Sequence, residues 1–167
     1  ESEWSLDQGP TISLRESKTM GFSFHDPAGK ELLRLGKHEL VREVVNSPHR
    51  KALLFKIDND NGFGGCLLRV SLRDKVPEFE RVLAYPATPL FEGKRWWVSD
   101  LGAVSDDGDM VLAKIGWMPQ KTGRVSYEWQ TWSIAKQKQL GNGLQIGNGR
   151  IQAAEQGMGE KPVKPAN

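Results

Sequence analysis

Aromatic residues are concentrated in one part of the chain, where they suggest a binding surface. Five of the six tryptophans lie between residues 96 and 132. In the run 125–134, the alternation of a β-strand places Tyr127 and Trp129 on one face and Trp132 on the other. Aromatic rings gathered in this way bind sugars or form the centre of a protein interface. The sequence therefore predicts a ligand-binding platform made of Trp96, Trp117, Tyr127 and Trp129. The alternative is that the same rings fill a wide layer of core.

An acidic loop is the second candidate for chemistry, because residues 58–62 alternate acidic and amide side chains before a glycine. Oxygen ligands of this kind suit calcium, and an EF-hand wants a further oxygen at its fifth position, Gly at the sixth and Glu at the twelfth. The residues at those three positions are Gly62, Phe63 and Arg69. A hairpin loop rich in turn-forming residues explains the same pattern. We therefore expect no metal site, with calcium held by Asp58 and Asp60 as the alternative.

Catalytic motifs are missing from the sequence. None of the three histidines, His25, His38 and His49, has a second ligand at metal-binding spacing. The chain contains no nucleophile elbow, phosphate-binding loop or zinc-protease motif. Its one cysteine, Cys66, excludes an internal disulfide and is expected to be a buried thiol. We therefore expect a chain that is not an enzyme and needs no cofactor.

A repeat shows which elements would position these residues. Residues 47–57 align without a gap on residues 105–115. Each copy has a polar turn followed by a nearly unbroken apolar run, 52–57 or 110–115. A run of this length is typical of a strand covered on both faces. In the second copy Asp107-Gly108 is a strong signal for a tight hairpin.

The repeat extends on both sides of these strands. Arg69–Leu72 matches Thr131–Ile134, and Arg81–Leu83 matches Lys138–Leu140, so each unit is predicted to be a four-stranded antiparallel meander. Upstream, residues 22–35 form a further expected hairpin, closed by Pro27-Ala28-Gly29. Residues 11–15 are expected to add an earlier strand to that unit.

The turn sequence Ser-Pro-x-x-Lys before an apolar strand, with a later aliphatic-polar-aliphatic strand, resembles β-propeller blades of the Ser-Pro-Asp-Gly-Lys kind. The resemblance covers roughly residues 20 to 140, and His49-Arg50 departs from the favoured Asp-Gly. The chain has room for about three units, whereas closed propellers have roughly four to eight blades. The resemblance thus implies an all-β fold of blade-like units, an open or incomplete propeller, in a periplasmic or secreted protein. The alternative is a two-sheet β-sandwich.

Composition and chain ends complete the expected organisation. A length of 167 residues, with 38% hydrophobic and 26% charged residues, fits one domain, and a net charge of +2 gives no reason to expect nucleic acid. No stretch is long and apolar enough for a membrane span. We expect a single all-β domain over residues 11–150, between a flexible N-terminus (1–10) and a flexible tail (151–167). Short edge strands are expected at 144–146 or 150–152, and no helix.

These expectations favour a non-catalytic binding or scaffolding domain for a protein partner outside the cytoplasm. One alternative is a carbohydrate-binding module that uses the aromatic platform. Another is an accessory part of a larger propeller enzyme. A chain of blade-like units that closes by association would form a homo-oligomer.

Overall fold

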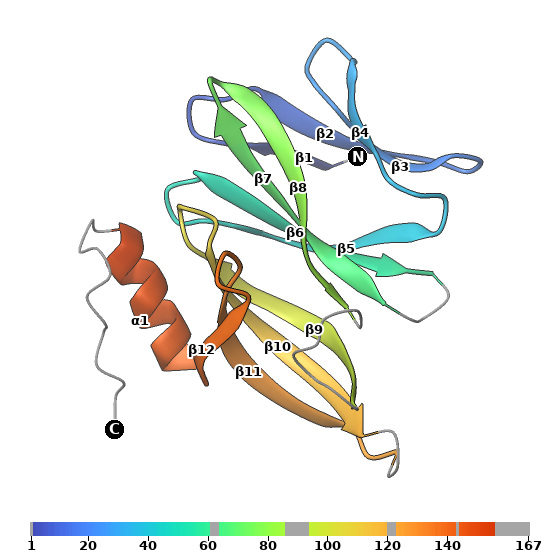
Figure 1. Ribbon diagram of the computed structural model, residues 1–167. Helices are drawn as coiled ribbons and strands as arrows, with labels where there is room; N and C mark the ends of the chain where they lie inside the picture. The colour runs from blue at the N-terminus through green and yellow to red at the C-terminus, as the bar shows by residue number, and fades with distance from the viewer. Residues whose placement is uncertain (1, 61–63, 86–93, 120–122, 143, 156–167) are drawn as a thin grey trace.

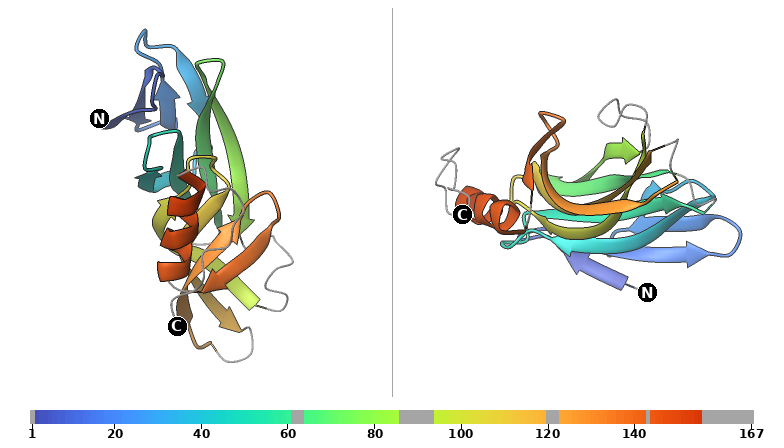
Figure 2. Two further views of the ribbon diagram at one scale, coloured as in Figure 1. Left: turned by 90° about the vertical axis from the view of Figure 1, so that its left-hand side faces the viewer. Right: turned by 90° about the horizontal axis from the view of Figure 1, so that it is seen from below.

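The structure is a computed structural model that describes residues 2–60, 64–85, 94–119, 123–142 and 144–155. It is an all-β fold of three four-stranded antiparallel sheets, each a meander of consecutive strands, followed by one helix. This confirms the predicted fold class of antiparallel, blade-like units. The three sheets stack face to face (Figures 1 and 2), so the structure does not have the two layers of the sandwich alternative.

The strands follow the chain in order. Sheet 1 contains β1 (Ser2–Ser5), β2 (Thr11–Ser17), β3 (Gly21–His25) and β4 (Glu31–Arg34). Sheet 2 contains β5 (Glu39–Asn46), β6 (Ala52–Asn59), β7 (Gly65–Arg73) and β8 (Val76–Tyr85). Sheet 3 contains β9 (Lys94–Val104), β10 (Met110–Pro119), β11 (Ser126–Ser133) and β12 (Lys138–Asn142), and α1 (Leu144–Glu155) follows it. No helix of the described residues is long and apolar enough to cross a membrane.

Sheet 2 lies in the middle of the stack and is covered on both faces. Along β6, Leu53 and Phe55 belong to the apolar cluster shared with sheet 1, whereas Leu54 belongs to the cluster shared with sheet 3. Every residue from Ala52 to Ile57 is buried. The uninterrupted apolar run is thus explained by two hydrophobic neighbours, as predicted, because successive side chains of a strand point to opposite faces.

The two copies of the repeat have the same turn geometry. The Ser47 amide donates to the Ala52 carbonyl at 2.8 Å, and the Ser105 amide donates to the Met110 carbonyl at 2.9 Å. In both turns the serine hydroxyl accepts a hydrogen bond from the amide that starts the next strand. This extra bond fixes the turn and explains why serine opens each copy.

The strand register confirms the predicted alignment of β7 with β11, the third strands of sheets 2 and 3. The predicted alignment of the fourth strands, β8 and β12, is wrong. Val70 and Trp132 occupy equivalent positions opposite the two apolar strands. Their partners on the fourth strands are Phe79 and Gln139, so Phe79 and not Val82 is equivalent to Gln139. The reason is that β7 runs two residues further before its turn than β11 does, since it pairs to Arg73 and Val76.

The two ends of the domain differ from the sequence-based expectation. Residues 2–5, expected to be flexible, form β1 in register with β2. Trp4 packs edge-to-face on Phe55 at a centroid distance of 4.9 Å, and Leu6 is buried beside it. These two apolar side chains hold the otherwise polar segment against sheet 2. Residues 144–155 form α1 in place of an edge strand, with Ile151 and Ala153 buried. Residues 156–167 of the expected tail lie outside the described residues.

Candidate functional site

The two faces of sheet 3 divide the predicted aromatic platform. The face toward sheet 2 contains Val111, Ala113 and Ile115, which belong to the apolar cluster between the two sheets. Trp96 pairs with Trp117 in register, and both rings lie against that cluster. Tyr127 and Trp129 alternate with Trp132 along β11 and therefore lie on the opposite, outer face. The four predicted residues thus form two separate pairs.

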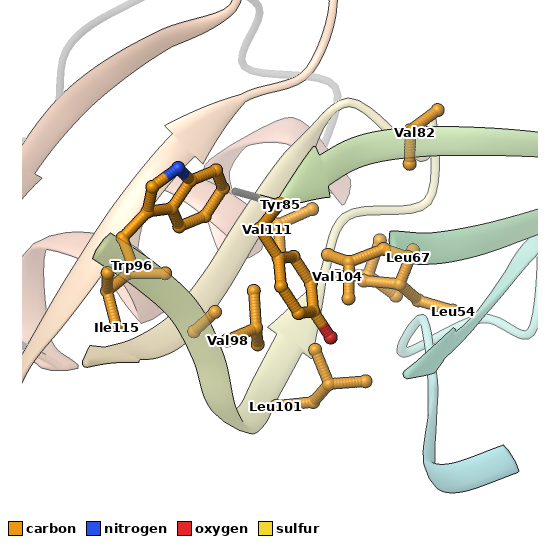
Figure 3. Packing of buried hydrophobic residues seen from close by; sticks show 11 residues of the cluster. Leu54, Leu67, Val82, Tyr85, Trp96, Val98, Leu101, Val104, Val111 and Ile115 are labelled. Atoms are coloured by element: carbon orange, nitrogen blue, oxygen red, sulfur yellow. The ribbon is translucent and has the colours of Figure 1, made fainter. Parts of the chain in front are cut away.

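Trp96 is a core residue. It is only 1% exposed and packs against Tyr85 at a centroid distance of 5.4 Å. Figure 3 shows both rings within the apolar cluster. Trp117 is partly buried on the same cluster, and Trp132 is also buried. The alternative that the tryptophans fill a wide core layer therefore describes these three rings, and Trp96 and Trp117 join sheet 3 to sheet 2.

Tyr127 and Trp129 of the predicted platform share the outer side of sheet 3 with Trp97 and Lys114. We call these four residues the outer aromatic face. Trp97 and Tyr127 meet edge-to-face with ring centroids 6.1 Å apart. The Lys114 ammonium lies 5.3 Å from the centre of the Tyr127 ring, within reach of a cation–π interaction. Tyr127 is 53% exposed. An exposed ring held by a second ring and a cation is an ordered and accessible contact surface.

Two glycines allow Trp97 and Trp129 to lie close to the backbone of sheet 3. A Cβ on Gly116 would come within 2.6 Å of the Trp97 indole, and one on Gly102 within 2.9 Å of the Trp129 ring. Glycine inside a strand often marks a place where another group approaches the backbone closely. This was the signal in the sequence that could have added Trp97 to the platform, since Gly116 is its direct cross-strand partner.

Helix α1 covers one end of the same outer face. At Gly147 the helix approaches sheet 3 so closely that a Cβ would lie 2.5 Å from Thr131 Oγ1 and 2.7 Å from Leu112 Cδ1. Leu112 is buried as a result. In the right view of Figure 2 the helix lies to one side of the sheets, next to the ends of their strands. The cover is partial, because Tyr127 is exposed.

A cavity of about 520 Å³ lies between sheet 2 and strand β9. Its lining includes Asp58, whose carboxylate oxygens accept hydrogen bonds from the Tyr85 hydroxyl at 2.6 Å and from the Lys56 ammonium at 2.8 Å. Burial, followed by the hydrogen bond to Asp58, raises the pKa of Tyr85, which keeps the phenol protonated. Arg42 adds a longer ion pair to Asp58 at 3.8 Å.

The calcium alternative receives no geometric support from Asp58 and Asp60. Asp58 is engaged by Lys56 and Tyr85, whereas Asp60 Oδ2 lies 3.0 Å from His38 Nδ1. Among the described residues, no group of three or more His, Cys, Asp or Glu side chains is placed to hold a metal ion. The remaining loop residues 61–63 of the predicted motif lie outside the described part of the chain.

The other reactive side chains have structural partners. His25 is buried, with Nε2 2.8 Å from the Ser23 hydroxyl. His49 joins the turn of sheet 2 to Asp106 in the turn of sheet 3. Cys66 is buried, as predicted, and burial raises the pKa of its thiol against a weaker opposing effect of Arg81. A thiol with a raised pKa is a poor nucleophile.

Comparison with known proteins places no relative beside this chain: no family model, no curated protein and no solved structure matches it.

Proposed function

We propose that this chain is a non-catalytic binding or scaffolding domain that holds a protein partner on its outer aromatic face, outside the cytoplasm. The observation that carries the proposal is the cluster of Trp97, Tyr127 and Lys114 on a sheet face that α1 covers only in part. The position outside the cytoplasm is supported by the likeness of the Ser47–Lys51 turn to blades of periplasmic and secreted propellers.

The chemistry of the face favours a protein over a small ligand. Tyrosine and tryptophan give large, rigid contact areas at low entropic cost and are enriched at interface hot spots. Trp97 and Trp129 each lie over a glycine, which fixes the rings before a partner arrives. Lys114 places a positive charge beside the exposed Tyr127 ring. The matching partner surface presents an apolar side chain next to a carboxylate.

The test compares four forms of the domain as bait on the extracytoplasmic fraction of the source organism. The forms are the wild type, Tyr127→Ala, Lys114→Glu and the control Val76→Ala. Val76 is also an exposed apolar residue, but it lies on the β7–β8 hairpin of sheet 2. We expect one stoichiometric protein that wild type and the control retain and that both outer-face variants lose. Any capture that Lys114→Glu retains should become weaker as the salt concentration is lowered, because less salt screens the repulsion between the new carboxylate and that of the partner.

Two results would contradict the proposal. One is a set of captured proteins that is the same for all four forms. The other is loss of capture in the control as well, which would place the interface elsewhere. Melting curves of each variant separate a lost contact from a lost fold.

Carbohydrate binding is the second candidate, and the position of Trp97 on Gly116 favours it. A ring that lies against glycine on one side resembles the flat platforms on which sugar rings stack. Titration with neutral oligosaccharides should then change tryptophan fluorescence, and Tyr127→Ala should remove part of that change. A flat titration would leave the protein partner as the better proposal.

A further inference from the structure

The cavity between sheet 2 and strand β9 is a second candidate site, which shares only Trp97 with the outer aromatic face. It opens beside the edge strand of sheet 3, where Trp96, Trp97 and Val98 of β9 line one side. Arg42 and Lys56 of sheet 2 line the other side. A volume of about 520 Å³ falls within the range of pockets that bind small molecules, and a few convergent polar groups among apolar walls are typical of such pockets.

The charges of the cavity favour an anion. In its described lining, two cationic side chains of sheet 2, Arg42 and Lys56, share a single carboxylate, Asp58, which leaves one positive charge in excess. Asp58 is already saturated by Tyr85 and Lys56. Lys56 is only 8% exposed, so its charge acts in a poorly solvated environment. A negative group that enters the cavity gains from this excess of positive charge.

The geometry of Arg42 suits an oxyanion such as a carboxylate, and the apolar wall of the cavity favours one attached to a carbon skeleton. Within the described residues, Arg42 contacts Asp58 through Nε, at 3.8 Å, and its side chain is 56% exposed. The two terminal nitrogens of a guanidinium form a planar fork that matches the two oxygens of a carboxylate. The apolar side of the cavity, which includes Trp97 and Met118, suits the carbon skeleton of a molecule whose carboxylate binds Arg42.

We infer that this cavity binds a small carboxylate-bearing molecule of roughly monosaccharide size, with the carboxylate on Arg42 and the carbon skeleton against Trp97 and Met118. The inference does not depend on a protein partner, because Arg42 and Lys56 belong to sheet 2 and are absent from the outer aromatic face. Trp97 borders both sites, so its fluorescence reports on either.

The experiment titrates the full chain with three acids, D-glucuronate, citrate and benzoate, and with two controls, D-glucose and inorganic phosphate. Tryptophan fluorescence and amide chemical shifts serve as readouts. We expect at least one acid to bind, with shifts at residues 42, 56 and 95–99, and D-glucose to give none. Arg42→Gln should weaken that acid about tenfold, as expected for loss of a charge-assisted hydrogen bond. Arg42→Lys should lose less affinity for the acid, because lysine keeps the positive charge.

Arg73→Gln is the matched control, because Arg73 is a 79% exposed arginine at the opposite end of sheet 2. It should bind the acid like the wild type. The inference is overturned if none of the three acids binds, if D-glucose binds as well as D-glucuronate, or if Arg42→Gln leaves the affinity unchanged. Phosphate binding as tight as that of the acids would also overturn it, in favour of a general anion site. Lys114→Glu, which should abolish capture of the protein partner but leaves Arg42 and Trp97 in place, should not abolish acid binding, which separates this test from that of the proposed function.

Discussion

At the residue scale, the contact between Trp97 and Gly116 determines how the outer aromatic face is formed. Gly116→Ala would place a methyl group about 2.6 Å from the indole, closer than side chains approach. The ring must move, and Tyr127 loses its edge-to-face partner. Overpacking of this kind lowers the free energy of unfolding by about 1–3 kcal/mol. We expect that loss in urea unfolding, together with a changed near-UV circular dichroism spectrum.

The control for this substitution is Ser126→Ala on the neighbouring strand β11. Ser126 is exposed, and loss of its hydroxyl should change the free energy of unfolding by no more than about 0.5 kcal/mol. A Gly116→Ala variant as stable as this control, with an unchanged near-UV spectrum, would show that Trp97 does not lie on the glycine.

The hydrogen-bonded contact between His49 and Asp106 gives the stability of the domain a pH dependence. His49 Nδ1 lies 2.6 Å from Asp106 Oδ2 and links the turns of sheets 2 and 3. Partial burial acts to raise the pKa of Asp106, but hydrogen bonds from Ser47 and His49 outweigh it and hold this pKa below its ordinary value of 3.8. Because the folded state has the lower pKa, the stabilisation is complete above the unfolded pKa and is lost as pH falls through the folded one.

Asp106→Asn should therefore be less stable than the wild type near neutral pH, by no more than about 1 kcal/mol because the His49 side chain is exposed. The difference should shrink as pH falls below about 4. Urea unfolding at several pH values measures this difference, with Glu16→Gln at an exposed position of β2 as the control. A difference that stays constant down to acid pH would show that the carboxylate charge is not the cause.

At the scale of elements, helix α1 shows packing that prevails over intrinsic preference. Its sequence contains Gly147, Asn148 and Gly149, all poor helix formers. The helix forms because Gly147 permits close contact with Leu112 and Thr131 and because Ile151 and Ala153 become buried. Most helical stability in proteins comes from such tertiary contacts. The helix is thus a cover for sheet 3 rather than an independent element.

Substitutions at two adjacent positions test this account. Asn148→Ala, at an exposed position, should stabilise the domain by a few tenths of a kcal/mol, roughly the difference in helix propensity. Gly147→Ala gains more helix propensity. It should nevertheless lower the free energy of unfolding by about 1–3 kcal/mol, because the new methyl group collides with Thr131 and Leu112. Thermal unfolding followed at 222 nm compares the two. Stabilisation by both substitutions would mean that the helix does not pack as described.

The contrast between local sequence preference and packing against distant residues also explains what could be predicted from the sequence. The strands of sheets 2 and 3 followed from alternation and from turns whose serine bonds the next strand, features that lie within a few residues of each other. Helix α1 and strand β1 depend on partners far along the chain, Leu112 and Phe55, which no local pattern names. For the site, alternation placed Tyr127 and Trp129 correctly together. It could not place Trp96, because the β9–β10 pairing contains bulges that reset which face a residue occupies.

At the scale of the whole molecule, the two outer faces of the stack differ in character. The outer face of sheet 1 carries Ser13, Arg15, Ser23 and His25, since Ile12, Leu14 and Phe24 point toward sheet 2. Ser23 and His25 on this polar face are buried, whereas Ser13 is half-buried and Arg15 is exposed. The outer face of sheet 3 presents aromatic rings instead. Association of copies in a head-to-tail ring would join a polar face to an aromatic one, so the asymmetry favours a different protein on sheet 3 over a closed homo-oligomer.

The arrangement of the core predicts that the three sheets unfold together. Sheet 2 gives Leu53 to the cluster with sheet 1 and Leu54 to the cluster with sheet 3, and both side chains are fully buried. Leu53→Ala and Leu54→Ala should each lower the free energy of unfolding by about 2–5 kcal/mol. Because the sheets share sheet 2, each variant should still show one transition.

Two probes can test this cooperativity, because they observe different parts of the stack. Tryptophan fluorescence reports mainly on sheet 3 and far-UV circular dichroism on all strands, since five of the six tryptophans lie between residues 96 and 132. Coincident curves in both variants are expected for a single cooperative unit. If Leu53→Ala shifted the circular dichroism transition and left the fluorescence transition in place, sheet 1 would unfold by itself, and sheet 2 would not couple the two ends of the molecule.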